Sequence, residues 1–248
     1  IGCFGEPGTG KTYTAMTWAV GLAQKINKDT IWFVDSENAG PYVLSIARNA
    51  GIRVEYVSTR SFLDLADVMT EKLDTGDILL VDTITHFWDD LVDSYAKAKG
   101  KRTPNPLTKP LQFEFQDWFP IKRGMWEPRF SKLFVWGQFH AFFCGREQIT
   151  YSYEKDEDTG KRALIETGQR MRAEKQFGYE PDTTFRFTTK TVSELRSELN
   201  MDAEEAKALT ACLARSKPVP FPGAFIPRGS DWTCFCATIA KARTPSLT

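Results

Sequence analysis

One short segment of this chain has the residue types and spacing needed to hold a chain of phosphates. It reads Gly5-Glu6-Pro7-Gly8-Thr9-Gly10-Lys11-Thr12 and is followed by Tyr13. The glycines allow successive backbone N–H groups to point inward at phosphate oxygens, and a helix that begins here adds partial positive charge. Lys11 would contact the β- and γ-phosphates, and the Thr12 hydroxyl would bind Mg²⁺. The segment from Gly5 to Tyr13 therefore predicts a site for ATP with Mg²⁺.

Two carboxylates follow apolar runs further along the chain. Asp82 ends the run Ile-Leu-Leu-Val-Asp, which is the pattern of an aspartate that holds Mg²⁺ through water. Glu37 lies just past another such run, where the carboxyl ends of strands meet the ligand crevice of an α/β sheet. Glu37 could orient an attacking water there, and an ordinary solvated loop acid after Asp35 explains the same pattern equally well.

The elements that must position these residues alternate between strand and helix. A strand ends at Gly5, and helical spacing runs over residues 11–26. Further strands are predicted at 30–34, 53–57, 77–82, 139–145 and 183–189, with helices at 40–50 and 61–73. Residues 149–154 and 161–166, joined by an acidic turn at 156–160, predict a hairpin. Strand and helix in alternation predict an α/β fold with a doubly wound, mainly parallel sheet.

The domain organisation follows from where this alternation holds. We expect a core over residues 1–190, with an insertion over about 89–132 that is part helix and part loop. Residues 191–248 form a C-terminal helical and Pro-rich appendage, with helices expected at 193–199 and 202–215.

Composition narrows the class of protein without deciding its partner. The chain has 32 Lys and Arg against 32 Asp and Glu, so its net charge favours neither nucleic acid nor a membrane. Five scattered cysteines indicate a reduced compartment rather than a disulfide framework. Without a signal peptide or a spanning apolar run, we expect a cytoplasmic protein with no membrane partner.

Several motifs together resemble RecA-like ATPases, and more narrowly the recombinase-type AAA ATPases encoded by bacteriophages. The matching segments cover about residues 1–190 and read GEPGTGKT, WFVDSEN, ILLVDTITHFWDDL, AFFCGREQ and GQRMRAEKQFGYEPDTTFRF. The resemblance implies a RecA-like P-loop core that hydrolyses ATP, with Glu37 as the water-activating glutamate, in the host cytoplasm if phage-encoded. It also implies that Arg146 or Gln148, at the end of a core strand, senses the γ-phosphate; an ordinary polar strand end is the equal alternative.

Assembly is a further implication of the resemblance. Such ATPases form rings or filaments in which basic residues of one subunit reach the nucleotide of the next. Arg170, Arg172 and Lys175 are the candidates for this trans role, because arginine stabilises charge on a transferred phosphate. A solvated basic helix face is the alternative.

The segment from Tyr95 to Lys132 could contact single-stranded DNA. It holds nine basic residues against three acidic ones, interleaved with aromatic residues. The basic residues are Lys97, Lys99, Lys101, Arg102, Lys109, Lys122, Arg123, Arg129 and Lys132, and the aromatic residues are Phe113, Phe115, Trp118, Phe119 and Trp126. The alternative is a subdomain whose aromatic residues form its own core. Residue by residue that alternative is favoured, whereas the family resemblance favours DNA and allows a single-strand-binding protein as a further partner.

The leading expectation is an oligomeric ATPase that acts on single-stranded DNA in phage-type recombination, annealing or replication. One alternative is a nucleotide-dependent assembly switch that hydrolyses ATP without binding DNA. Another is a P-loop small-molecule kinase, which would need an arginine-bearing lid and an acceptor pocket.

Overall fold

The computed structural model describes residues 1–100, 113–155, 162–190 and 234–242. The chain forms two compact units. One consists of residues 12–144, and the other combines residues 1–11 with the described residues after 144.

Among its described residues, the compact unit formed by residues 12–144 contains four parallel strands. They are β2 (Thr30–Asp35), β3 (Arg53–Ser58), β4 (Ile78–Asp82) and residues 140–144 of β5 (His140–Lys155), in the order β3-β2-β4-β5. Every residue of β4 is buried, as expected for an apolar strand covered on both faces. The register pairs Asp35 with Asp82 and Asp82 with Cys144, so neighbouring strands end level with one another.

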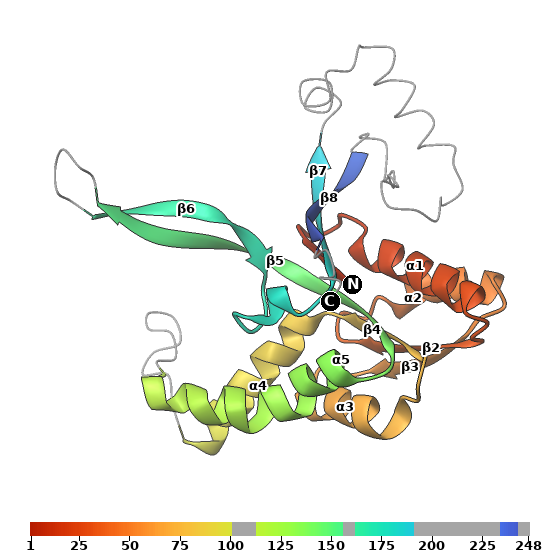
Figure 1. Cartoon of the computed structure of the whole chain (residues 1–248), viewed down its shortest axis with the longest axis horizontal. Coiled ribbons are helices and arrows are strands. Elements are labelled where there is room, and N and C mark those ends of the chain that lie inside the picture. The colour runs from red at the N-terminus through yellow and green to blue at the C-terminus, as the bar shows by residue number, and fades with distance from the viewer. Residues whose placement is uncertain (101–112, 156–161, 191–233, 243–248) are drawn as a thin grey trace, which may run out of the picture. The chain divides into compact units, whose positions relative to one another are not determined.

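Helices cover both faces of this sheet. Figure 1 shows α1 (Lys11–Lys25) and α2 (Gly40–Asn49) on one face, with α3 (Phe62–Asp67), α4 (Ile84–Ala98) and α5 (Lys132–Trp136) on the other. A π-helical turn, η1 (Val68–Lys72), continues α3 to the end of the predicted helix. The α/β class with a doubly wound, mainly parallel sheet is confirmed.

The insertion after Asp82 is more regular than its sequence suggests. Besides α4 and α5, its described residues form a 3₁₀ turn, η2 (Phe115–Asp117), and a π-helical segment, η3 (Pro120–Ser131). Trp126 is 1% exposed, and its ring lies 5.8 Å from Phe62 and 5.1 Å from Trp88 between centroids. Trp126 thus belongs to a core with α3 and α4, whereas Phe115 and Phe119 are exposed.

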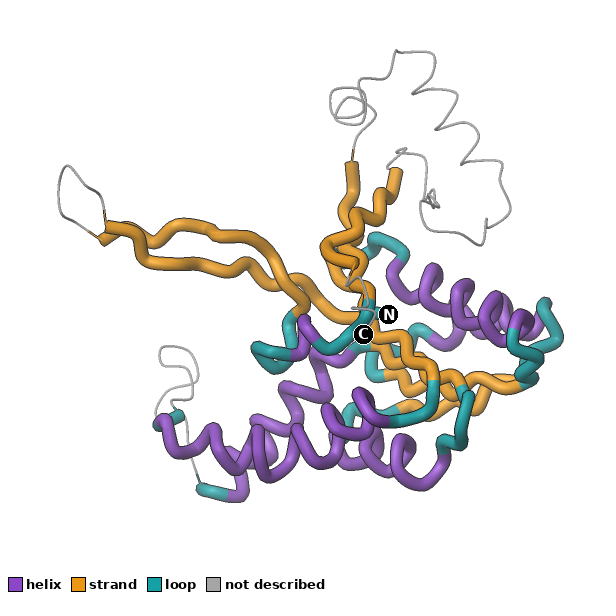
Figure 2. Tube along the Cα trace, viewed as in Figure 1, coloured by secondary structure: helices purple, strands orange, loops and turns teal. Residues whose placement is uncertain are grey.

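The second unit contains two strand pairings of its own. β1 (Gly2–Gly5) runs parallel to β7 (Thr183–Lys190), and β8 (Cys234–Ala242) pairs antiparallel with β7. Residues 147–155 of β5 pair antiparallel with β6 (Arg162–Met171), and Figure 2 shows the two strands running side by side as a ribbon. A 3₁₀ turn, η4 (Phe177–Tyr179), follows β6.

The ribbon confirms the predicted hairpin, but two features of this unit were not predicted. β5 is continuous from His140 to Lys155, whereas the sequence pattern ended it at residue 145. The strand β8 lies in the segment read as a helical and Pro-rich appendage. The acidic turn at 156–160 and the helices predicted at 193–199 and 202–215 lie outside the described residues.

Gly5 shows how tightly β1 packs against β7. Its φ is +147°, and a Cβ at this position would lie 1.9 Å from the carbonyl oxygen of Phe187. Only glycine fits, so the start of the phosphate loop is fixed by backbone packing. In the part of the chain that the structure describes, no helix has the length and apolarity to cross a bilayer.

Candidate functional site

The predicted phosphate loop connects β1 to α1. Gly8 and Gly10 adopt positive φ values of 76° and 82°, a backbone conformation that glycine adopts without a steric penalty. Thr9 Oγ1 donates to the Glu6 carbonyl at 2.8 Å, which closes the turn. Lys11 Nζ donates to the carbonyls of Gly5 (3.1 Å) and Glu6 (2.7 Å), so its positive charge lies against the loop. A cation on a glycine-rich turn at a helix N-terminus is suited to bind phosphate.

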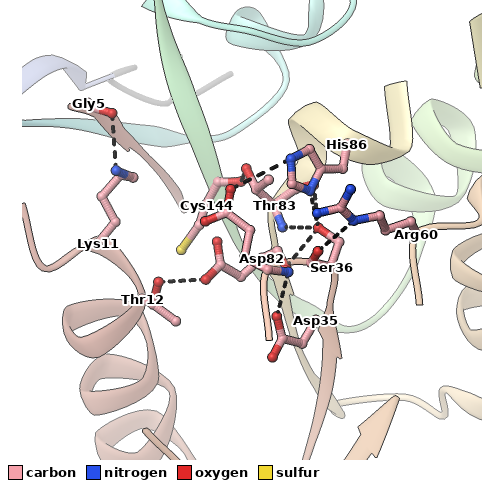
Figure 3. A network of polar contacts seen from close by, with 11 residues as sticks. Gly5, Lys11, Thr12, Asp35, Ser36, Arg60, Asp82, Thr83, His86 and Cys144 are labelled. Carbon is pink, nitrogen blue, oxygen red and sulfur yellow. Dashed lines mark hydrogen bonds and ion pairs between the residues drawn. The ribbon is translucent and has the colours of Figure 1, made fainter. Parts of the chain in front are cut away.

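Thr12 and Asp82 lie in contact although they are far apart in sequence. Thr12 Oγ1 donates to Asp82 Oδ2 at 2.5 Å, and Asp82 is 1% exposed at the end of β4 (Figure 3). A hydroxyl beside a carboxylate offers two oxygen ligands of the kind that Mg²⁺ prefers. The donor set therefore fits the predicted metal, which these residues would hold directly or through water.

The ends of β2 and β4 are joined through Ser36. Ser36 N donates to the Asp82 carbonyl at 2.5 Å, and Thr83 N donates to Ser36 Oγ at 2.8 Å. The Asp82–Thr83 peptide bond is cis, and Thr83 Oγ1 donates to the Cys144 carbonyl at 3.0 Å. The carboxyl ends of three neighbouring strands are thus held together by hydrogen bonds.

A buried carboxylate organises the turn that carries Glu37. Asp35 is 0% exposed and accepts hydrogen bonds from Glu37 N, Gly40 N and the Tyr56 hydroxyl, each at 2.9 Å. Burial and the hydrogen bond to Asp35 raise the pKa of Tyr56 above its usual value. Because two backbone donors of the turn are fixed by one carboxylate, the position of Glu37 is defined.

Glu37 itself has a partly exposed carboxylate beside a histidine. Its side chain is 34% exposed, and Oε1 lies 3.8 Å from Nε2 of His86 in the first turns of α4. Arg60 Nε donates to the Ser36 carbonyl at 3.0 Å. Sequence reasoning did not select Ser36, Arg60 or His86. A signal was present for His86, which stands four residues after Asp82 at the strand end where ligands bind.

The two sensor candidates lie within a strand instead of at its end. Arg146 and Gln148 are exposed residues of β5, which continues to Lys155, so the predicted strand end is wrong. The strand continues because β6 supplies a new pairing partner from Glu147 onward. Gln148 Oε1 accepts a hydrogen bond of 3.5 Å from the Arg170 guanidinium.

The trans candidates lie at the end of β6 and in the turn beyond it. Arg170 belongs to β6 and also donates to the Lys175 carbonyl at 3.2 Å, while Arg172 and Lys175 are exposed. No helix carries them, so the alternative of a basic helix face is wrong. A trans role for Arg170, Arg172 or Lys175 stays a prediction.

The basic and aromatic segment is only partly available to a ligand. Phe115 and Phe119 are 96% and 71% exposed, but Arg123 pairs with Glu127 at 2.7 Å and Lys99 lies 5.8 Å from the Tyr95 ring. Lys101, Arg102 and Lys109 lie outside the described residues. Trp126 packs inside, and DNA binding by this segment stays a prediction.

Comparisons with known proteins agree with this geometry. No curated protein matched the chain. A family model described as an AAA domain matches residues 1–205 and thus includes the phosphate loop, Glu37 and Asp82. Proteins with this domain generally bind and hydrolyse nucleotides. On this match the chain belongs to the AAA domain family.

Proposed function

We propose that this protein hydrolyses ATP as an oligomer and acts on single-stranded DNA in recombination, annealing or replication of the phage type. The observation that carries the ATPase part is the 2.5 Å contact between Thr12 and Asp82. A loop that only bound phosphate would not need a carboxylate placed at the hydroxyl that follows its lysine.

Each residue has a separate task in the proposed reaction. Lys11 would bind the β- and γ-phosphate oxygens, and Thr12 with Asp82 would hold Mg²⁺, whose charge neutralises the phosphates. Glu37 would accept a proton from a water as that water attacks the γ-phosphorus. A new bond from the water oxygen to phosphorus forms while the bond to the β-phosphate oxygen breaks, and ADP leaves with the electron pair.

Hydrolysis is favoured over transfer to a small-molecule acceptor by the turn at Glu37. Asp35 fixes this turn through two backbone N–H groups, and Glu37 keeps a partly exposed carboxylate. In a kinase, the hydroxyl group of a second substrate would occupy the position in which we propose that Glu37 activates water. The general base of the kinase would have to reach that hydroxyl group.

Single-strand binding is proposed to use the ribbon of β5 and β6. Tyr151 and Tyr153 are 55% and 74% exposed, and as alternate residues of one strand they share a face with Ile149. Exposed aromatic rings on one face can stack successive bases. Phe115 and Phe119 offer a second exposed pair, and they serve as the matched comparison.

The test is phosphate release with and without single-stranded DNA, together with DNA affinity over a range of salt. We expect DNA to stimulate release, and we expect affinity to fall steeply with salt. Tyr151→Ser with Tyr153→Ser should weaken binding by on the order of tenfold, whereas Phe115→Ser with Phe119→Ser should not. Equal losses in both pairs would reject the ribbon as the site. Absent binding at low salt would favour the assembly switch, and nucleotide binding without any phosphate release would reject the ATPase.

A further inference from the structure

His86 lies between Ser36 and Glu37, the residue that the proposed reaction uses as its base. Its ring is 11% exposed in the first turns of α4, with Nδ1 3.0 Å from Ser36 Oγ and Nε2 3.8 Å from Glu37 Oε1. Figure 3 shows the His86 ring beside Ser36 and Arg60. We propose that His86 is a positioning residue that orients the Glu37 carboxylate, an inference that rests on Glu37 being the base of the proposed reaction.

Ser36 contacts the His86 ring through its hydroxyl group. Ser36 Oγ accepts the Thr83 N–H at 2.8 Å and has one proton to donate, which can go to Nδ1 of His86 at 3.0 Å or to the Asp82 carbonyl at 3.1 Å. When that proton goes to Nδ1 of His86, the neutral ring carries its own proton on Nε2, the nitrogen that faces Glu37. A protonated Nε2 attracts the carboxylate, whereas a lone pair there would repel it. The tautomer that can hold Glu37 is therefore the one in which Ser36 donates to His86 instead of to the Asp82 carbonyl.

The same arrangement links the base to the metal site. Ser36 is bonded to the backbone of Asp82 and Thr83, and Asp82 is the residue in contact with Thr12. His86 thus connects the Glu37 turn after β2 to the strand end that presents Asp82. The separation of 3.8 Å is longer than a hydrogen bond, and catalytic contacts of this kind commonly shorten when the reacting complex forms.

A core histidine with no influence on the reaction is the competing explanation, since the ring is mostly buried. The two explanations differ in what a change at His86 does to each kinetic constant. Loss of a positioning residue lowers kcat while nucleotide binding is retained, because only the alignment of the base is disturbed. Loss of a packing residue lowers stability and leaves kcat per folded molecule unchanged.

The experiment compares His86→Phe, which keeps a ring of similar size without nitrogens, with His86→Gln, which keeps an N–H donor. Steady-state ATP turnover, ATP affinity and thermal unfolding are measured on the full chain, with Glu37→Gln as the reference. We expect His86→Phe to lower kcat by about tenfold or more with KM changed less than about twofold. His86→Gln should recover part of that loss.

Further variants separate this inference from the proposed function. Ser36→Ala, which removes the hydroxyl in contact with Nδ1 of His86, should also lower kcat and should add little when combined with His86→Phe. This variant also keeps the inference testable should His86→Phe not fold. Normal kcat in both His86→Phe and Ser36→Ala, or equal losses in His86→Phe and His86→Gln, would overturn the positioning role. Normal turnover by Glu37→Gln would instead reject the proposed base, whatever His86 does.

Discussion

At the scale of single residues, the candidate site brings together side-chain oxygens from distant parts of the chain. Thr12 and Asp82 are 70 residues apart and share a 2.5 Å hydrogen bond. Their contact follows from the fold, since α1 begins at the phosphate loop and β4 ends with Asp82. The two side chains that we propose as Mg²⁺ ligands are therefore held in place by secondary structure, and the part of Thr12 can be tested by removing its hydroxyl.

Thr12→Ala should remove most of the benefit that Mg²⁺ gives to ATP binding. We expect Mg²⁺-dependent affinity to fall by about tenfold or more, equivalent to about 1.4 kcal/mol, because one oxygen ligand is lost. Titration of ATP with Mg²⁺ and with a chelator measures this difference. Thr12→Ser keeps the hydroxyl and is the control; if Thr12→Ala and Thr12→Ser show the same Mg²⁺ dependence, Thr12 is not a ligand.

Sequence alone can identify functional residues that belong to one short motif. Gly5 to Thr12 could be selected because spacing alone defines the loop, and Asp82 because it ends an apolar strand. The sequence offers weaker grounds for identifying Asp35, Ser36 and His86 as functional residues. Their roles arise from the pairing of β2 with β4 and from the start of α4, which place them around Glu37.

At the scale of elements, the close approach of β1 to β7 fixes where the phosphate loop begins. Gly5→Ala should destabilise the protein by roughly 3 kcal/mol, because a Cβ would lie 1.9 Å from the Phe187 carbonyl oxygen. Gly178→Ala is the control, since a Cβ there meets no atom within 4 Å and should change stability by less than about 0.5 kcal/mol. Denaturant unfolding measures both. Equal stability of the two variants would show that β1 does not pack as described.

The aromatic residues of the insertion give a second test of element packing. Trp126→Ala should cost about 3–5 kcal/mol, because the ring is 1% exposed and stacks between helices. Phe115→Ser, at a residue that is 96% exposed, should cost little. Thermal unfolding of the two variants separates a core from a solvent-facing groove. A stable Trp126→Ala variant would contradict the assignment of this ring to the core.

The end of β5 and the strand β8 could not be predicted from local sequence patterns. The predicted strand at 139–145 stopped at Gly145 because a buried apolar run there gives way to alternating exposed residues. The strand continues, but its partner changes from the parallel strand β4 to the antiparallel strand β6. Strand β8 pairs with β7, which lies more than forty residues earlier, so no local pattern indicated it. Pairing over such distances is decided by the fold.

At the scale of the whole molecule, the composite site remains the main prediction about assembly. Arg172 is exposed after β6, and we propose that it acts on the nucleotide of a neighbouring subunit. Arg172→Ala and Glu37→Gln should each be inactive alone. Mixed in equal amounts they should recover about a quarter of wild-type turnover, because some interfaces then combine an intact base with an intact arginine. No recovery in verified mixed oligomers would exclude a trans role.

We propose that Glu37 activates water for ATP hydrolysis, with Thr12 and Asp82 holding Mg²⁺. This role of Glu37 is tested most directly by measuring ATP binding and single-turnover phosphate release on the same sample of Glu37→Gln. We expect ATP affinity within about twofold of the wild type and phosphate release slowed by on the order of a hundredfold or more. Wild-type phosphate release by this variant would contradict this role.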